Sequence, residues 1–209
     1  RRQRQMCIRD RAIRYLFQNA SLLVVIMIAA VLNLELVGLT IGAPVIVAKH
    51  LGMQSSFVGI IEVAMGLGGL FGSGLVGIWP HRFSFKGICR YVAMICFGVV
   101  PIIVTLLSGP DELAFAALAA GSAWVMAWAG ITSVEIVSFV QRSAPKELCG
   151  KVLALVYMTL SCATPIGQLV YGLAYDRWTP AIVFAGMLAV LTLTTALFYR
   201  LKSRLWRMS

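Results

Sequence analysis

Residues 21–41 read SLLVVIMIAAVLNLELVGLTI, a long apolar run that carries one ionisable residue, Glu35. A helix needs about 20 apolar residues to cross the hydrocarbon core of a bilayer. Five similar runs follow, at residues 56–79, 88–107, 113–140, 152–174 and 181–199. Hydrophobic residues make up 60% of the 209 residues and charged residues only 12%, about half the charged share of a typical soluble domain. The sequence therefore predicts an all-α membrane protein with six spanning helices.

Residues that commonly interrupt helices separate the predicted spans. They are Pro44, Gly52, Pro80, Gly109, Pro110, Pro145, Gly150 and Pro180. We predict a connection at each of these places and a single six-helix transmembrane domain over residues 12–200. Pro44 and Pro165 are also candidates for kinks in helices that move during a functional cycle.

Lysine and arginine are unevenly distributed among the predicted loops. Ten lie in the second and fourth loops and the C-terminal tail: Arg82, Lys86, Arg90, Arg142, Lys146, Lys151, Arg200, Lys202, Arg204 and Arg207. The other three loops contain only Lys49 and Arg177. Because cytoplasmic loops of membrane proteins are enriched in cations, we predict a multi-pass protein of the cell (cytoplasmic) membrane with both ends in the cytoplasm. Residues 201–209 would then form a basic cytoplasmic tail.

Aromatic residues occur near the predicted membrane boundaries, where amphipathic rings are enriched. They are Trp79, Tyr91, Tyr171, Tyr175, Trp178, Tyr199 and Trp206. Two interpretations stay open for each ring, namely an interfacial belt or ordinary packing between helices.

The first eleven residues, RRQRQMCIRDR, differ from the rest of the chain. Residues 6–11 resemble the translation of a transposase adapter used to prepare sequencing libraries, although a basic signal-peptide start would look similar. We expect residues 1–11 to be an artefact and the natural reading frame to be longer. Without their five Arg and one Asp, the net charge falls from +10 to +6. The remaining cations lie at helix ends, so no nucleic-acid partner is expected.

Residues 77–86, GIWPHRFSFK, follow the second predicted span. They are similar to the cytoplasmic loop motif of the major facilitator superfamily, roughly G-x-L-a-D-R-x-G-R-K, at Gly77, Arg82 and Lys86. His81 stands where the family usually has an acidic residue, so the resemblance does not extend to a charge relay at this loop.

Two further stretches resemble the same superfamily. Residues 141–152, QRSAPKELCGKV, resemble the Q-x-x-x-P-x-E-x-x-G-R-V segment of its macrolide-efflux and siderophore-exporter branch, with Lys151 in place of Arg. Pro165 and Gly167, followed by GLAYD at residues 172–176, resemble its second-to-last helix. The resemblance implies the C-terminal six-helix half of a twelve-helix transporter, built from two inverted three-helix repeats.

The same resemblance implies a function. The branch leads us to expect proton-coupled efflux of drugs or other small molecules, without a cofactor. The expected partners are the lipid bilayer, a small-molecule substrate, protons and the missing N-terminal half of the same chain.

Ionisable residues inside a membrane span are costly and usually face the bundle interior or a wet cavity. Glu35 lies in the outer half of the first span, two residues after Asn33. We take both residues as candidates for binding a proton or a cationic substrate. Proximity to the outer surface, or a hydrogen bond to a neighbouring helix, is the alternative for Glu35.

Glu62 shares one predicted helix face with small residues, namely Gly66, Gly69, Ser73 and Gly77. Small residues at this spacing allow helices to approach closely. We therefore expect Glu62 to lie at a packing seam rather than to be exposed, and to be either a proton-exchange site or a structural hydrogen-bonding group.

Glu135 lies near the cytoplasmic end of the fourth span, two turns before Arg142. An ion pair between them is one interpretation, and it would hold an inner gate together with Arg82 and Lys86. The commoner interpretation is an interface carboxylate close to water.

Other function classes are less compatible with the sequence. It contains no H-E-x-x-H and no G-x-x-x-x-G-K-[ST] motif, and its two histidines, His50 and His81, lie in predicted loops. The five cysteines lack metal-ligand spacing, so neither zinc nor disulfides are expected. We therefore do not expect an enzyme. A channel-like oligomer and a six-helix module that binds or regulates a partner remain as alternatives.

Overall fold

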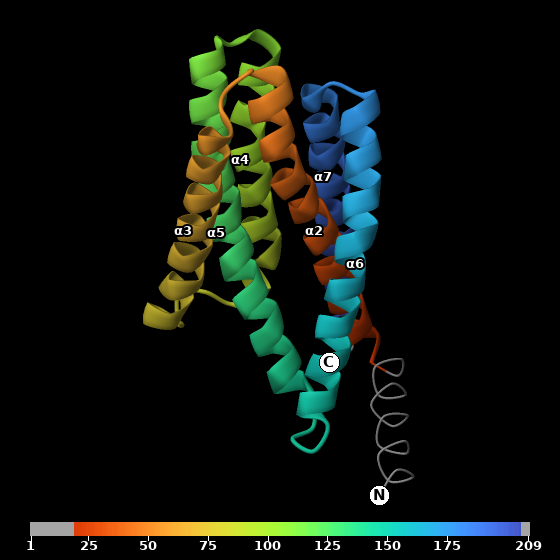
Figure 1. The fold of residues 1–209 in the computed structure, drawn as a ribbon. Helices are drawn as coiled ribbons and strands as arrows, with labels where there is room; N and C mark the ends of the chain where they lie inside the picture. The colour runs from red at the N-terminus through yellow and green to blue at the C-terminus, as the bar shows by residue number, and fades with distance from the viewer. Residues whose placement is uncertain (1–18, 206–209) are drawn as a thin grey trace, which may run out of the picture.

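The computed structural model of the protein describes residues 19–205, which form six long helices and no strand. The long helices are α2 (Ala20–Val45), α3 (Ser55–Ile78), α4 (Ile88–Ser108), α5 (Asp111–Ser143), α6 (Cys149–Arg177) and α7 (Pro180–Leu205), shown in Figure 1. Two short segments join them, the π-helix η1 (Ile46–His50) and the 3-10 helix η2 (Phe85–Gly87). Each long helix is long and apolar enough to cross a membrane, which confirms the prediction of six spans.

The first predicted connection lies later in the chain than expected. The helix α2 continues through Pro44 and leads directly into η1, where Leu51 N–H donates to Ile46 O at 2.9 Å, one residue further back than in an α-helix. Proline removes one intrahelical hydrogen bond, and the wider π turn follows it directly. The chain turns instead at Gly52, whose φ of 61° favours glycine. The predicted break at Pro44 was therefore wrong.

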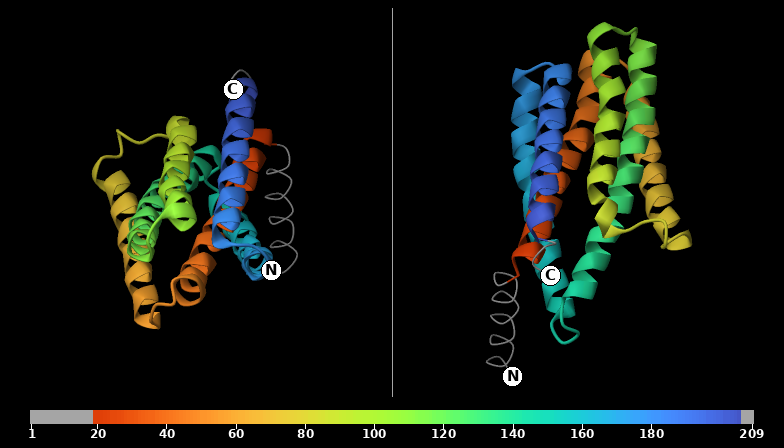
Figure 2. Two further views of the ribbon diagram at one scale, coloured as in Figure 1. Left: turned by 90° about the horizontal axis from the view of Figure 1, so that it is seen from above. Right: turned by 180° about the vertical axis from the view of Figure 1, so that it is seen from behind.

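The helices form two layers around α5. Figure 2 shows α2, α3 and α6 along one side of the bundle and α4 and α7 along the opposite side. The main packing pairs are α3 with α5, α4 with α5, α2 with α6 and α4 with α7. We call the side formed by α2, α3 and α6, which faces the viewer in Figure 1, the front face.

The seam between α3 and α5 depends on small residues. A side chain on Gly68 or Gly72 would clash with the backbone of Ala123 or Ala127, respectively. The buried residues of α3 accordingly include Ile61, Met65, Gly72 and Val76. This face is turned by about one residue, or roughly 100°, from the face predicted to carry the seam.

The two ends of the bundle differ in charge. The connections 79–87 and 144–148 and the last described turns of α7 lie at one end, which we call the basic end, together with the start of α2 (Figure 1). At the opposite end, Lys49 Nζ lies 3.5 Å from Asp176 Oδ1 in an exposed ion pair. The ends of the described chain thus lie on the same side, as an even number of spans requires, while their cytoplasmic location stays a prediction.

Candidate functional site

The contact between α2 and α6 brings two glycines against two tyrosines. Gly38 and Gly42 are four residues apart on α2, and Tyr171 and Tyr175 are four residues apart on α6, so each pair lies on one helix face. A Cβ on Gly38 would lie 2.7 Å from the ring of Tyr171, and one on Gly42 would clash with the hydroxyl of Tyr175. Both rings can pack against α2 because Gly38 and Gly42 have no side chains.

Each tyrosine hydroxyl donates a hydrogen bond to α2. Tyr171 Oη donates to Glu35 Oε2 at 2.6 Å, and Tyr175 Oη donates to Gly38 O at 3.1 Å. Glu35 is only 3% exposed, so the carboxyl is buried among the helices. Of the interpretations left open for Glu35, the hydrogen bond to a neighbouring helix is confirmed.

The surroundings of Glu35 beyond Tyr171 are apolar. A cavity of about 10 Å³ lies beside Glu35, and its other lining residues are Leu32, Leu36, Leu39, Ile95, Val99, Val125, Met187 and Leu191. Among the described residues no cation pairs with this carboxyl. An ionised carboxylate there would have one hydrogen bond and no counter-ion, which is costly in an apolar interior. A carboxyl in this setting is suited to carrying a proton.

A second cavity of about 90 Å³ lies between α2, α5 and α6. Its polar lining residues are Asn33, Thr132 and Ser133, and the rest are aliphatic. The Asn33 carbonyl accepts a hydrogen bond from Thr164 Oγ1 at 3.2 Å. We call this cavity the central cleft. Asn33 lines the central cleft and Glu35 lines the smaller cavity, and the two cavities adjoin because Leu32, Leu36 and Ile95 line both.

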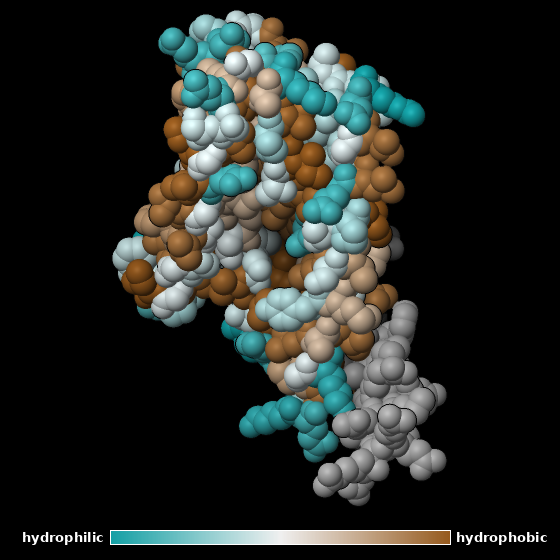
Figure 3. Space-filling view, in the orientation of Figure 1, coloured by the Kyte–Doolittle hydropathy of each residue, from teal (hydrophilic) through white to brown (hydrophobic). Residues whose placement is uncertain are grey.

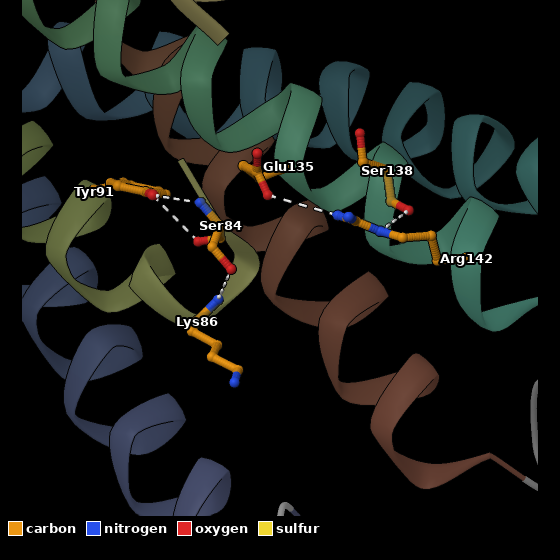
Figure 4. A network of polar contacts seen from close by, with 6 residues as sticks. All are labelled: Ser84, Lys86, Tyr91, Glu135, Ser138 and Arg142. Carbon is orange, nitrogen blue, oxygen red and sulfur yellow. Dashed lines mark hydrogen bonds and ion pairs between the residues drawn. The ribbon is translucent and has the colours of Figure 1, made fainter. Parts of the chain in front are cut away.

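Glu135 and Arg142 approach each other near the basic end. Arg142 Nη2 lies 3.9 Å from Glu135 Oε2, and Arg142 Nε donates to Ser138 O at 3.2 Å (Figure 4). The Glu135 side chain is 5% exposed, against 69% for Arg142. Within the described part of the chain, Glu135 Oε2 accepts no hydrogen bond. The predicted pair is confirmed, and the interpretation of an interface carboxylate near water was wrong because the carboxyl is buried.

Tyr91 stabilises the connection from α3 to α4 through two hydrogen bonds to Ser84. Its hydroxyl accepts from Ser84 N–H at 3.0 Å and donates to Ser84 O at 3.2 Å (Figure 4). Phe85 stacks on Phe139 of α5 with ring centroids 4.0 Å apart. The two cations predicted to join the gate, Arg82 and Lys86, are exposed in this connection, and the ion pair of Glu135 is formed with Arg142 instead.

Glu62 is exposed, contrary to the prediction that it lies at a packing seam. The seam uses mainly the neighbouring face of α3. Of the predicted small residues, Gly69 and Ser73 lie close to Gly130 of α5, whereas an added Cβ on Gly66 would meet nothing within 4 Å. An exposed carboxylate inside a span needs a protein or water neighbour, because hydrocarbon does not solvate it.

The helices α3 and α6 are the least covered spans. Only 17% of the most apolar stretch of α3 and 22% of that of α6 are buried, against 33–44% in the other four spans. On α6, Tyr157, Ser161 and Gln168 are exposed as well. Figure 3 shows hydrophilic and intermediate residues through the middle of the front face, which is also hollowed there.

Two site residues were missed by sequence reasoning. For Tyr171 and Tyr175 an interfacial belt and packing between helices were left open, and packing is confirmed because both rings are buried against α2; their hydrogen bonds to Glu35 and to Gly38 O were not predicted. The available signal was a pair of glycines and a pair of tyrosines with the same four-residue spacing, but nothing in the sequence connected the two pairs.

No three His, Cys, Asp or Glu residues in the described part of the chain come together as a metal site. A family profile described as transmembrane secretion effector matches residues 5–209, nearly the whole chain. No curated protein matches the chain at a significant level.

Proposed function

Because the chain belongs to the transmembrane secretion effector family, whose members are transporters of the major facilitator type, we propose that it exports small molecules in exchange for protons. The membrane would be the cell membrane, with the basic end in the cytoplasm. In this proposal Glu35 carries the proton.

The observation that carries the proposal is the environment of Glu35. Its carboxyl is buried in the α2–α6 contact, with Tyr171 as its hydrogen-bond partner and aliphatic side chains around the adjoining cavity. Taking up a proton removes the cost of a buried charge, and releasing it restores that cost. A change of protonation would therefore alter the stability of the α2–α6 contact and favour one arrangement of these helices over another.

The front face is the proposed surface of the transport pathway. Exposed polar residues of α3 and α6, including Glu62 and Gln168, lie within spans and need a cover other than lipid. We propose that a second six-helix bundle covers them, supplied by further residues of the same chain. The central cleft, which lies between α2, α5 and α6, would then face the space between the two bundles.

The pair of Glu135 and Arg142 is the proposed inner gate. Arg142 is exposed while Glu135 is buried. A molecule or proton that breaks this ion pair would therefore reach it from the basic end. The conformational change would open this end while the α2–α6 contact closes the opposite one.

Everted membrane vesicles test the proposal. Cells expressing the complete gene product would supply the vesicles, and Nile red, ethidium and Hoechst 33342 are the probes. An acid interior should drive uptake of at least one dye, and nigericin, which collapses the pH gradient, should abolish that uptake. Dye uptake that persists with nigericin, or no gradient-dependent uptake of any dye, would contradict proton-coupled export and favour a partner-binding module.

A further inference from the structure

An apolar groove lies between α3 and α5. It encloses about 930 Å³, a volume in the range of sites for drug-sized ligands. On α3 it is lined by residues from Ala64 to Ile78, and every residue that lines it on either helix is apolar or glycine. The indole N–H of Trp124, which lines the groove, already donates to Met94 O at 2.9 Å. Hydrocarbon can therefore fill the groove without leaving a polar group unpaired.

The groove lies on the opposite side of α3 from Glu62. Phe71, which lines the groove, follows Glu62 by nine residues, which is about two and a half helical turns. The side chains of Leu67, Leu70 and Phe71 are 61–71% exposed. Exposed apolar patches of this kind mark surfaces that contact a membrane or a partner. The groove therefore faces away from the polar residues of the proposed transport pathway.

The length of the groove matches one leaflet of a bilayer. From Ala64 to Ile78 the helix rises about 21 Å, at 1.5 Å per residue, whereas all 24 residues of α3 span about 36 Å. Because Ile78 is the last residue of α3, the groove reaches the basic end and stops near the middle of the span. One leaflet contributes about 15 Å of the hydrocarbon core, so the groove can take an extended acyl chain.

Two arginines without a carboxylate partner lie at the basic end of α3 and α4. Arg82 is in the turn that follows α3, where its backbone N–H donates to Trp79 O at 3.0 Å. Arg90 is in the first turn of α4, with its guanidinium carbon 5.8 Å from the centroid of the Tyr91 ring. Residues 63–110 contain no Asp or Glu, and neither arginine forms an ion pair with a described residue.

Aromatic rings connect Arg90 with the groove. Tyr91 stacks on Trp128 with ring centroids 5.9 Å apart, and the Trp128 ring lies 6.0 Å from that of Trp124, which lines the groove. The connection 79–87 crosses from α3 to α4 at the same end of the bundle (Figure 2). The apolar groove thus has exposed cations at one end only.

From these observations we propose that the groove binds one acyl chain of an anionic glycerophospholipid, whose phosphate is bound by Arg82 and Arg90. Guanidinium groups bind phosphate through charge-assisted hydrogen bonds, and basic pockets between spans bind anionic lipid head groups. A second copy of the chain in the same membrane orientation would bring its own basic end to these arginines, so the charges favour the lipid. With the predicted orientation, this lipid belongs to the cytoplasmic leaflet.

Photoreactive lipids test the proposal on the complete gene product in nanodiscs of equal parts phosphatidylglycerol and phosphatidylcholine. In each sample only one of the two lipids carries a diazirine midway along an acyl chain, and mass spectrometry maps the labelled residues. Labelling is normalised to that around Leu107, an exposed residue at the opposite end of α4. We expect phosphatidylglycerol to label the stretch from Leu67 to Leu75 at least about fivefold more than phosphatidylcholine, because one cation near anionic lipid contributes about that factor.

Substitutions of the arginines identify the head-group site. Arg82→Gln and Arg90→Gln should each lower the preference for phosphatidylglycerol, and the double variant should abolish it. Arg177→Gln, an exposed arginine at the opposite end of the bundle, is the matched control and should keep the preference. Equal labelling by the two lipids in the unsubstituted protein, or a preference that survives in the double variant, would overturn the proposal.

Filling the groove identifies the acyl-chain site. A Cβ on Gly74, which lines the groove, meets nothing within 4 Å, so Gly74→Leu should fold normally and occupy the space of the acyl chain. Labelling of the groove by phosphatidylglycerol should fall to the level of phosphatidylcholine. Gly59→Leu is the matched control, since Gly59 is on the same helix in open space and outside the groove. Equal labelling of the two variants, with equal melting temperatures, would contradict a chain bound in the groove.

A second copy of the chain is the competing occupant. Weak labelling of the groove by both lipids, together with a disulfide-linked dimer of Phe71→Cys that the unsubstituted protein does not form, would assign the groove to that copy and overturn the proposal. The labelling needs no proton gradient, so its result is independent of the dye-uptake test of transport.

Discussion

Tyr171 Oη donates a hydrogen bond to Glu35 Oε2 at 2.6 Å across the contact between α2 and α6. Gly38, three residues after the carboxylate, provides the space that the tyrosine ring occupies. One glycine thus allows the ring to enter, and the ring carries the only hydrogen-bond donor that reaches Glu35 from the described residues. The geometry at the proposed proton site depends on both.

Replacing Tyr171 with Phe should slow gradient-driven dye uptake at least severalfold, because the carboxyl loses its donor while the ring stays over Gly38. Tyr175→Phe is the matched control, since its hydroxyl bonds to the backbone oxygen of Gly38 rather than to Glu35. We expect that control to lower stability by about 1 kcal/mol and to leave uptake near the unsubstituted rate. Initial rates in everted vesicles measure both, and a larger loss with Tyr175→Phe than with Tyr171→Phe would refute this role.

Adding a methyl group at Gly38 should destabilise the α2–α6 contact. The new Cβ would lie 2.7 Å from Tyr171, and overpacking of this kind costs about 1–3 kcal/mol. Thermal unfolding in detergent should show a lower melting temperature for Gly38→Ala. An equal change for Gly66→Ala, whose Cβ would meet nothing within 4 Å, would show that the effect is general to helical glycines.

Gly72→Ala should be more damaging than a change at the tyrosine contact. Its Cβ would clash with backbone atoms of Ala127, which cannot move aside as a side chain does, so α3 and α5 must separate. We expect a loss of more than the roughly 1–3 kcal/mol expected at Gly38. Gly74→Ala lies two residues away on the same helix, where an added Cβ meets nothing within 4 Å, and it should keep the melting temperature. Equal melting of the two variants would contradict the close seam.

Arg142→Gln should destabilise the basic end, because it leaves the buried Glu135 carboxylate without its cation. Since Arg142 is largely exposed and the pair is 3.9 Å apart, the loss should be near 1 kcal/mol rather than the larger cost of a fully buried pair. Adding Glu135→Gln to this variant removes the unpaired charge and should restore part of the melting temperature. No recovery in the double variant would show that the pair does not couple.

The six spans could be predicted because span length and hydropathy are local properties of the chain. The fourth span, for example, is recognisable from the apolar residues between Pro110 and Pro145, and α5 occupies that interval. The helix break predicted at Pro44 does not occur, because proline removes only one hydrogen bond from a helix that the rest of the bundle supports.

The choice of helix face could not be made from the sequence. Glycines surround α3 on several sides, so small residues alone did not distinguish the face of Glu62 from that of Gly72. The deciding partners, Ala123 and Ala127, lie more than fifty residues later on α5. The same holds for Tyr171, whose carboxylate partner is 136 residues earlier in the chain.

The charged candidate residues show the same contrast: a pair on one helix could be predicted, whereas contacts of residues in a connection could not. The pair of Glu135 and Arg142 was predictable because both residues lie on one helix, two turns apart, and side chains at that spacing share a face. The cations of the connection 79–87 were not, since η2 and the stacking of Phe85 on Phe139 set the path of that connection.

The central claim is that Glu35 carries the proton and does not bind the substrate. The most direct test compares Glu35→Gln with the control Glu112→Gln, an exposed residue at the start of α5, in proteoliposomes containing the complete gene product and the dye that everted vesicles accumulate. Two quantities are measured: accumulation driven by a pH gradient, and equilibration of the dye without a gradient. We predict that Glu35→Gln loses accumulation and keeps equilibration, whereas Glu112→Gln keeps both. Accumulation by Glu35→Gln at the unsubstituted rate, or loss of both activities in Glu35→Gln alone, would contradict the claim.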